Sequence, residues 1–96
     1  METVWVFDGN NSHFPSGIFR NKDTAIEYIK KYKLSGTLTE YPLGISVYDW
    51  LIQEGRWHPK KPHESTPEFI GRFTDARQDH YHFENGNDND DESEES

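Results

Sequence analysis

The stretch Leu34–Gly55 constrains the fold more than any other part of this chain, because helix and strand signals follow one another closely in it. Gly36 is typical of the end of a helix, and the β-branched and aromatic residues of 37–41 favour a strand. Ser46 then offers its hydroxyl as the N-cap of a short helix, which Gly55 ends. Both kinds of element must share one small core, so the stretch predicts an α+β fold.

Segments on either side of this stretch supply the remaining elements. An apolar stripe at Ala25, Ile29 and Tyr32 is typical of an amphipathic helix, and the alternation in Gln78–Glu84 is typical of a half-buried strand. Pro67–Phe73 fits a helical turn better than a strand. We expect strands near residues 3–8, 16–20, 37–41 and 79–84, and helices near 22–34 and 46–54. The sequence therefore predicts a small antiparallel sheet of about four strands with two main helices packed on it.

The apolar residues are few but large. Only 31% of the 96 residues are hydrophobic, whereas 15% are aromatic, and each buried ring removes about 150–250 Å² from water. In Thr3–Phe7 both alternating sets of side chains are apolar, so we expect both faces of that strand to be covered. The predicted core consists of Val4, Val6, Phe19, Ile26, Ile29, Leu38, Val47, Trp50 and Leu51.

Acidic residues are concentrated at the C-terminal end of the chain. The formal net charge is −8, from 18 acidic and 10 basic residues, and six of the acids lie in Asn85–Ser96, which has no base. A low-complexity acidic segment has little to bury, so we expect residues 1–86 to form a single domain and residues 87–96 to be a disordered acidic tail. Such a tail can keep the protein in solution or bind a basic partner.

Composition also bears on the environment of the protein. The absence of cysteine excludes a disulfide and a thiolate zinc site. No apolar run approaches the roughly 20 residues of a membrane span, and the start METVWVFDG lacks the regions of a secretory signal. We interpret the lysines at the end of the predicted helix at 22–34 as a solvated face rather than a nucleic-acid patch. We expect a cytoplasmic protein that contacts neither nucleic acid nor membrane directly.

Residues that could carry chemistry do not form a recognised pattern. His80 and His82 lie two apart on one strand face and could hold part of a metal site, but no zinc spacing accompanies them, so we interpret them as solvated surface. No serine lies in a G-x-S-x-G turn, and no glycine-rich phosphate loop is present. We therefore expect no metal, no cofactor and no catalytic residue, and hence a protein that is not an enzyme.

Trp57 stands directly after the second predicted helix and before a proline-rich loop. It can close the core over that helix, or it can be exposed and anchor a partner, as tryptophan often does at interfaces. In the second interpretation the contact surface is the end of the helix and the loop that follows it. The predicted partner-binding residues are Glu40, Tyr48, Asp49, Glu54 and Trp57.

Several strings of this sequence resemble a family of small, uncharacterised, mostly bacterial proteins. They are VWVFDG, FPSGIF, LSGTLTEYPLGISVYDW, and PEFIGRF followed by HYHFENG, and they lie within residues 4–86. The resemblance implies neither an assigned activity nor catalytic residues. The acidic tail departs from what the family leads us to expect.

In size, charge and class the chain is also similar to immunity proteins of contact-dependent growth inhibition systems. Those proteins bind and neutralise a toxin domain, often a basic nuclease. This similarity implies a protein partner, most concretely a basic toxin domain. The alternative is a small enzyme or regulatory domain with a site that the sequence does not reveal.

Overall fold

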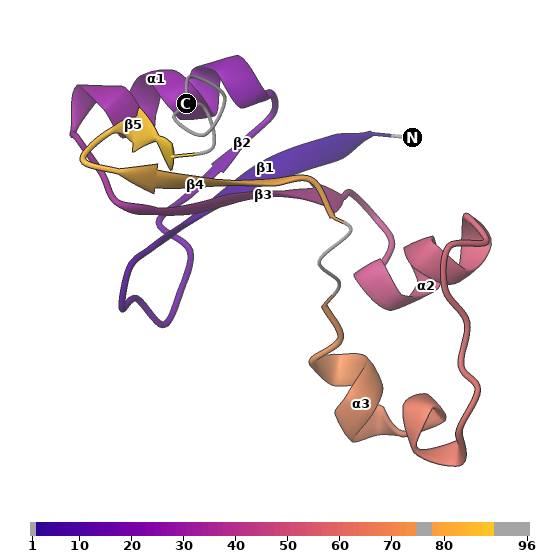
Figure 1. The fold of residues 1–96 in the computed structure, drawn as a ribbon. Coiled ribbons are helices and arrows are strands. Elements are labelled where there is room, and N and C mark those ends of the chain that lie inside the picture. Colours follow the sequence, from indigo (N-terminus) through magenta and orange to yellow (C-terminus); the bar gives the residue numbers. More distant parts are fainter. Residues whose placement is uncertain (1, 75–77, 90–96) are drawn as a thin grey trace.

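The computed structural model describes residues 2–74 and 78–89 (Figure 1). Its elements in chain order are β1 (Thr3–Gly9), β2 (Gly17–Phe19), α1 (Lys22–Lys31), β3 (Gly36–Pro42), α2 (Val47–Gln53), the 3-10 helix η1 (Pro62–Ser65), α3 (Pro67–Gly71), β4 (His80–Glu84) and β5 (Asn87–Asp88). The predicted α+β class is therefore confirmed, as is the helical turn expected after Pro67.

The strands of the described residues form one antiparallel sheet in the order β2-β1-β3-β4-β5. The long central pairing joins β1 to β3 over seven residues each and places Phe7 opposite Leu38. The fifth strand, β5, consists of Asn87 and Asp88, which pair with the end of β4. The sequence instead predicts that the disordered tail begins at residue 87. The rest of the predicted tail, residues 90–96, lies outside the described residues.

The helix α1 covers one face of this sheet (Figure 1). Its N-cap is Asn21, whose side-chain oxygen accepts from the backbone N–H of Thr24 at 2.9 Å. Its apolar stripe then meets alternate residues of the central strands. The resulting main core contains five buried side chains: Phe7, Ala25, Ile29, Leu38 and Phe83.

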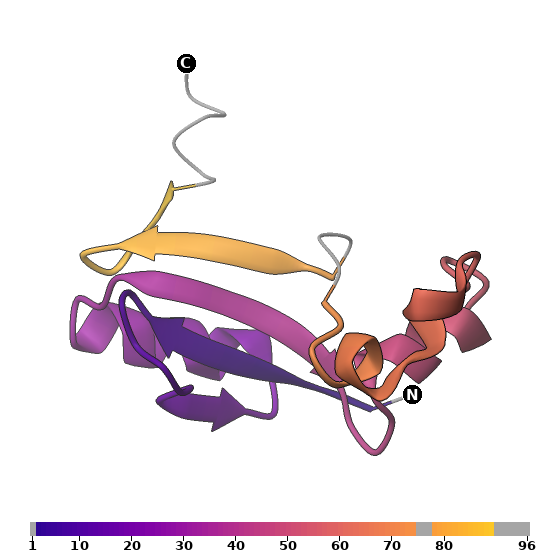
Figure 2. The same ribbon diagram turned by 90° about the horizontal axis from the view of Figure 1, so that it is seen from below.

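The opposite face of the sheet is not covered by any described helix (Figures 1 and 2). The expectation that both faces of the first strand are covered is therefore wrong. Val4 and Val6 point away from the main core and are half-buried, and Ile18 beside them is 67% exposed. The reason is the turn after Pro42, which carries the chain past the end of the sheet before α2 begins (Figure 1).

The residues of the predicted core are divided between the main core and α2, and not all of them are buried. Ile29, Leu38, Val47 and Leu51 are buried, whereas Phe19, Ile26 and Trp50 are only partly buried, like the two valines of β1. Phe7, Ala25, Tyr48 and Phe83 are also buried, although they are not among the nine residues of the predicted core.

Helices α2, η1 and α3 form what we call the side lobe, residues 47–73, at one end of the sheet (Figure 2). The lobe makes the molecule elongated, with principal dimensions of 44 × 30 × 28 Å. Gln78 binds the chain that returns from the lobe to β3. Its buried side chain donates from Nε2 to the backbone carbonyl of Glu40 at 3.1 Å.

Candidate partner-binding surface

An aromatic cluster holds the side lobe together. Trp57, Phe69 and Phe73 pack against one another in a triangle. The ring centroid of Trp57 lies 6.0 Å from that of Phe69 and 4.7 Å from that of Phe73, and the indole is nearly parallel to the Phe69 ring. Tyr48 of α2 contacts Trp57 and Phe73 edge to face, at 5.4 Å in each case. Such aromatic contacts add about 0.5–1.5 kcal/mol per pair beyond the burial of area. The indole of Trp57 is therefore fixed in one position by its neighbours.

Hydrogen bonds fasten the proline-rich loop to the same cluster. The Tyr48 hydroxyl donates to the carbonyl oxygen of Glu64 at 2.9 Å. The carboxylate of Glu64 accepts from the backbone N–H groups of Lys60 and Lys61, at 2.7 and 3.1 Å. These two bonds stabilise the ionised form, and they hold the pKa of Glu64 below its ordinary value. The loop between α2 and α3 is thus tied to the helix that precedes it.

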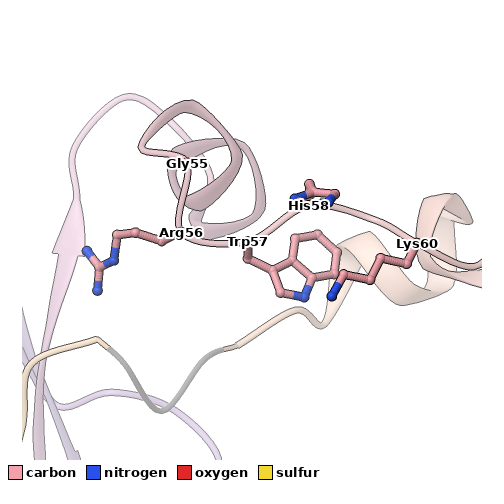
Figure 3. Close-up of a pocket in the computed structure, with 5 residues that line it drawn as sticks. All are labelled: Gly55, Arg56, Trp57, His58 and Lys60. Atoms are coloured by element: carbon pink, nitrogen blue, oxygen red, sulfur yellow. The ribbon is translucent and has the colours of Figure 1, made fainter.

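An open pocket of about 190 Å³ lies at the end of α2, beside this cluster (Figure 3). Its lining residues are Gly55, Arg56, Trp57, His58 and Lys60. None of them is acidic, so the pocket suits a ligand group that is negatively charged or aromatic. Figure 3 shows Lys60 reaching back toward the indole, whereas Arg56 points to the other side. The guanidinium of Arg56 lies 5.7 Å from the ring centre of Trp50.

The structure brings only some of the predicted partner-binding residues together. Trp57 is half-buried and lines the pocket, and Tyr48 contacts it from the buried side. Asp49 of α2 and Glu54, the residue that caps its C-terminus, are exposed and close to the pocket along the chain. Glu40 is separate from them: it lies on β3 and is half-buried, and its carboxylate accepts from the Thr3 hydroxyl at 2.6 Å.

Four lining residues were not among those predicted from the sequence: Gly55, Arg56, His58 and Lys60. The signal of the basic ones was present, because Arg56, His58 and Lys60 follow Glu54 within six residues without an intervening acid. What the sequence could not show was that the loop folds back and brings Lys60 toward the indole of Trp57 (Figure 3).

The uncovered face of the sheet is a second surface with exposed apolar groups. It carries Val4, Val6, Ile18 and Tyr41, and the histidines of β4 lie on the same face. Burial raises the pKa of Tyr41, and the charge of Asp8 adds to the effect. Antiparallel sheets often leave one face in water, but that face is then usually polar.

The described residues lack two features. They contain no group of three or more histidine, aspartate or glutamate side chains placed to hold a metal ion. None of the helices in residues 2–74 and 78–89 is long and apolar enough to cross a membrane.

The fold and this surface define a small α+β domain with an aromatic side lobe. The chain belongs to the family described as a domain of unknown function (DUF7710), whose profile matches residues 4–89. No curated protein matches the chain significantly. No solved structure does so either.

Proposed function

We propose that this protein is a binding protein without catalytic activity, and that it recognises another protein through the surface around Trp57. In its most concrete form, it is a cytoplasmic immunity protein that neutralises a toxin domain of a contact-dependent growth inhibition system. The observation that carries the proposal is the fixed indole of Trp57 at the edge of an open pocket.

A fixed aromatic side chain is a favourable binding anchor. Tryptophan is enriched among the residues that dominate interface energies, and these residues lie in well-packed pockets. Because the two phenylalanines of the lobe already hold the indole, binding loses little side-chain entropy there. A pocket built for catalysis would instead bring acid–base groups together around a reacting atom.

The charges around the pocket indicate how a partner would lie. Asp49 on α2 and Glu54 at its C-terminal cap are exposed and would pair with basic groups of a toxin domain. The pocket itself is lined by basic side chains, so it would receive an acidic or aromatic side chain of the same partner. The net charge of −8 attracts a basic nuclease over distance and accelerates the encounter, an effect that salt weakens.

The proposal is tested with the reading frame next to the gene. If that frame encodes a large secreted protein with a nuclease-like C-terminal domain, the two are co-expressed and growth is measured. We expect the full chain to rescue growth and to bind the purified toxin domain in calorimetry.

Two charge reversals then locate the surface. We expect Glu54→Lys and Lys60→Glu each to weaken binding about tenfold or more, because both lie at the proposed contact. Glu27→Lys is the matched control, since Glu27 is exposed on α1 away from the lobe. If the wild-type protein neither binds the toxin domain nor rescues growth, the immunity function is refuted and the small enzyme or regulatory domain is favoured.

A further inference from the structure

Two histidines of β4 lie together on the uncovered face of the sheet. Tyr81 and Phe83 of this strand pack toward the main core, so the alternating His80 and His82 point to the opposite side. Both are exposed. Their ring centroids are 5.2 Å apart and their planes are nearly perpendicular. The two imidazoles are therefore neighbours in space and accessible to a ligand from solvent.

The hydrogen bonds of these rings leave the outer nitrogens available. Nδ1 of His80 lies 2.8 Å from the carbonyl oxygen of Gln78. A carbonyl oxygen can only accept, so Nδ1 carries the proton and Nε2 of the neutral ring has a free lone pair. Nδ1 of His82 is 3.4 Å from the Thr37 hydroxyl, a weaker contact on the same side of the ring. The bond of His80 is typical of metal-binding histidines, whose other ring nitrogen usually donates to a carboxylate, a backbone carbonyl or water.

We propose that His80 and His82 together chelate a divalent first-row transition ion, such as Zn²⁺ or Ni²⁺, through their Nε2 atoms. Imidazole is a preferred ligand of these ions. The local charge favours a cation, because residues 78–89 contain Asp79, Glu84 and Asp88 but no lysine or arginine.

The site differs from a structural zinc site. The described residues place no third protein ligand beside the pair, so water or a ligand from another molecule fills the remaining positions. The strand is already paired on both sides, with β3 and β5, and does not need the ion in order to fold. The spacing of the two histidines allows part of a metal site but matches no zinc pattern. The bond from His80 to the Gln78 carbonyl adds that its ring is oriented for binding.

The test is a titration of the full chain with ZnSO₄, followed by long-range ¹H–¹⁵N NMR of the imidazole nitrogens. We expect one equivalent of zinc to shift the Nε2 resonances of His80 and His82, while those of His13, His58 and His63 stay in place. A uniform response of all five histidines, or no response of the His80 and His82 nitrogens, overturns the proposal.

Calorimetry with NiSO₄ gives a second, independent readout. We expect His80→Gln and His82→Gln each to weaken binding by at least about tenfold, the lower end of what even the loss of an outer-shell partner costs. His13→Gln is the matched control, because His13 is also exposed but lies in the β1–β2 loop. Unchanged affinity in either of the first two variants contradicts the site.

Discussion

At the scale of single residues, Gly36 is the glycine that leaves least space for an added side chain beside the main core. A Cβ added there would collide with the backbone carbonyl oxygen of Asp8 and would lie 2.8 Å from the Phe7 ring. We expect Gly36→Ala to lower the free energy of unfolding by about 1–3 kcal/mol, the usual cost of forcing extra atoms into a packed core. Thermal unfolding followed by circular dichroism measures the loss.

Gly71→Ala is the matched control for this substitution. A Cβ at Gly71 meets no atom within 4 Å, and the residue belongs to the last turn of α3. Alanine favours a helix over glycine, so this variant should be as stable as the wild type or slightly more stable. Equal destabilisation by both substitutions would show that crowding at Gly36 is not the cause.

The Tyr48 hydroxyl is expected to stabilise the folded protein through one hydrogen bond. Tyr48→Phe keeps the ring among its aromatic neighbours but removes the donor to the Glu64 carbonyl. We expect a loss of about 0.5–1.5 kcal/mol in the free energy of unfolding, measured by urea denaturation. Tyr32→Phe, at a residue that is 57% exposed, should change it little. A neutral Tyr48→Phe would mean that the loop does not depend on this bond.

At the scale of elements, the side lobe has an aromatic cluster of its own, separate from the five buried residues of the main core. We expect Phe73→Ala to loosen the lobe locally by about 1–3 kcal/mol, because its ring contacts three other rings but is only half-buried. Hydrogen exchange should accelerate in α2 and α3 while α1 and β3 stay protected. Acceleration throughout the sheet would show that the two clusters unfold as one unit.

The loop before α3 should make stability depend on pH. The folded state lowers the pKa of Glu64 below its ordinary value of 4.5, chiefly through the N–H groups of Lys60 and Lys61. A lowered pKa stabilises the fold above the unfolded value, and this contribution is lost as pH falls through the folded value. Glu64→Gln should therefore lose less stability than the wild type when pH is lowered from about 6 to about 3.

Melting temperatures measured across this pH range check the prediction. Glu68→Gln serves as the control, since Glu68 is an exposed carboxylate on the neighbouring helix. If Glu64→Gln and the wild type lose stability in parallel, the carboxylate does not act as the cap of this loop.

At the scale of the whole molecule, much of the negative charge lies after the last strand of the fold. Deletion of residues 90–96 removes five carboxylates. We expect the free energy of unfolding to change by less than about 0.5 kcal/mol, measured by thermal denaturation. We also expect slower association with a basic toxin domain at low salt and a weaker dependence of that rate on salt. A large loss of stability would show that this segment packs on the domain.

The sequence by itself determined the local elements, because their signals act over three or four residues. The Asn21 and Ser46 side chains cap α1 and α2 by accepting from backbone N–H groups three residues further on. The alternation in β4 likewise separated Phe83, which is buried, from the exposed histidines. These patterns are sufficient for the α+β class and for most element boundaries.

Only the tertiary structure decided which surfaces are covered and which residues meet. The β1–β3 pairing joins residues that lie 27 to 39 positions apart. It places Glu40, bonded to Thr3, in the sheet, whereas Trp57, with which the sequence grouped it, lines the pocket. Trp57 proved to be both a member of the aromatic cluster and part of the pocket wall, because the loop folds back on α2. Such contacts depend on where whole elements pack, and periodicity along the chain carries no information about that.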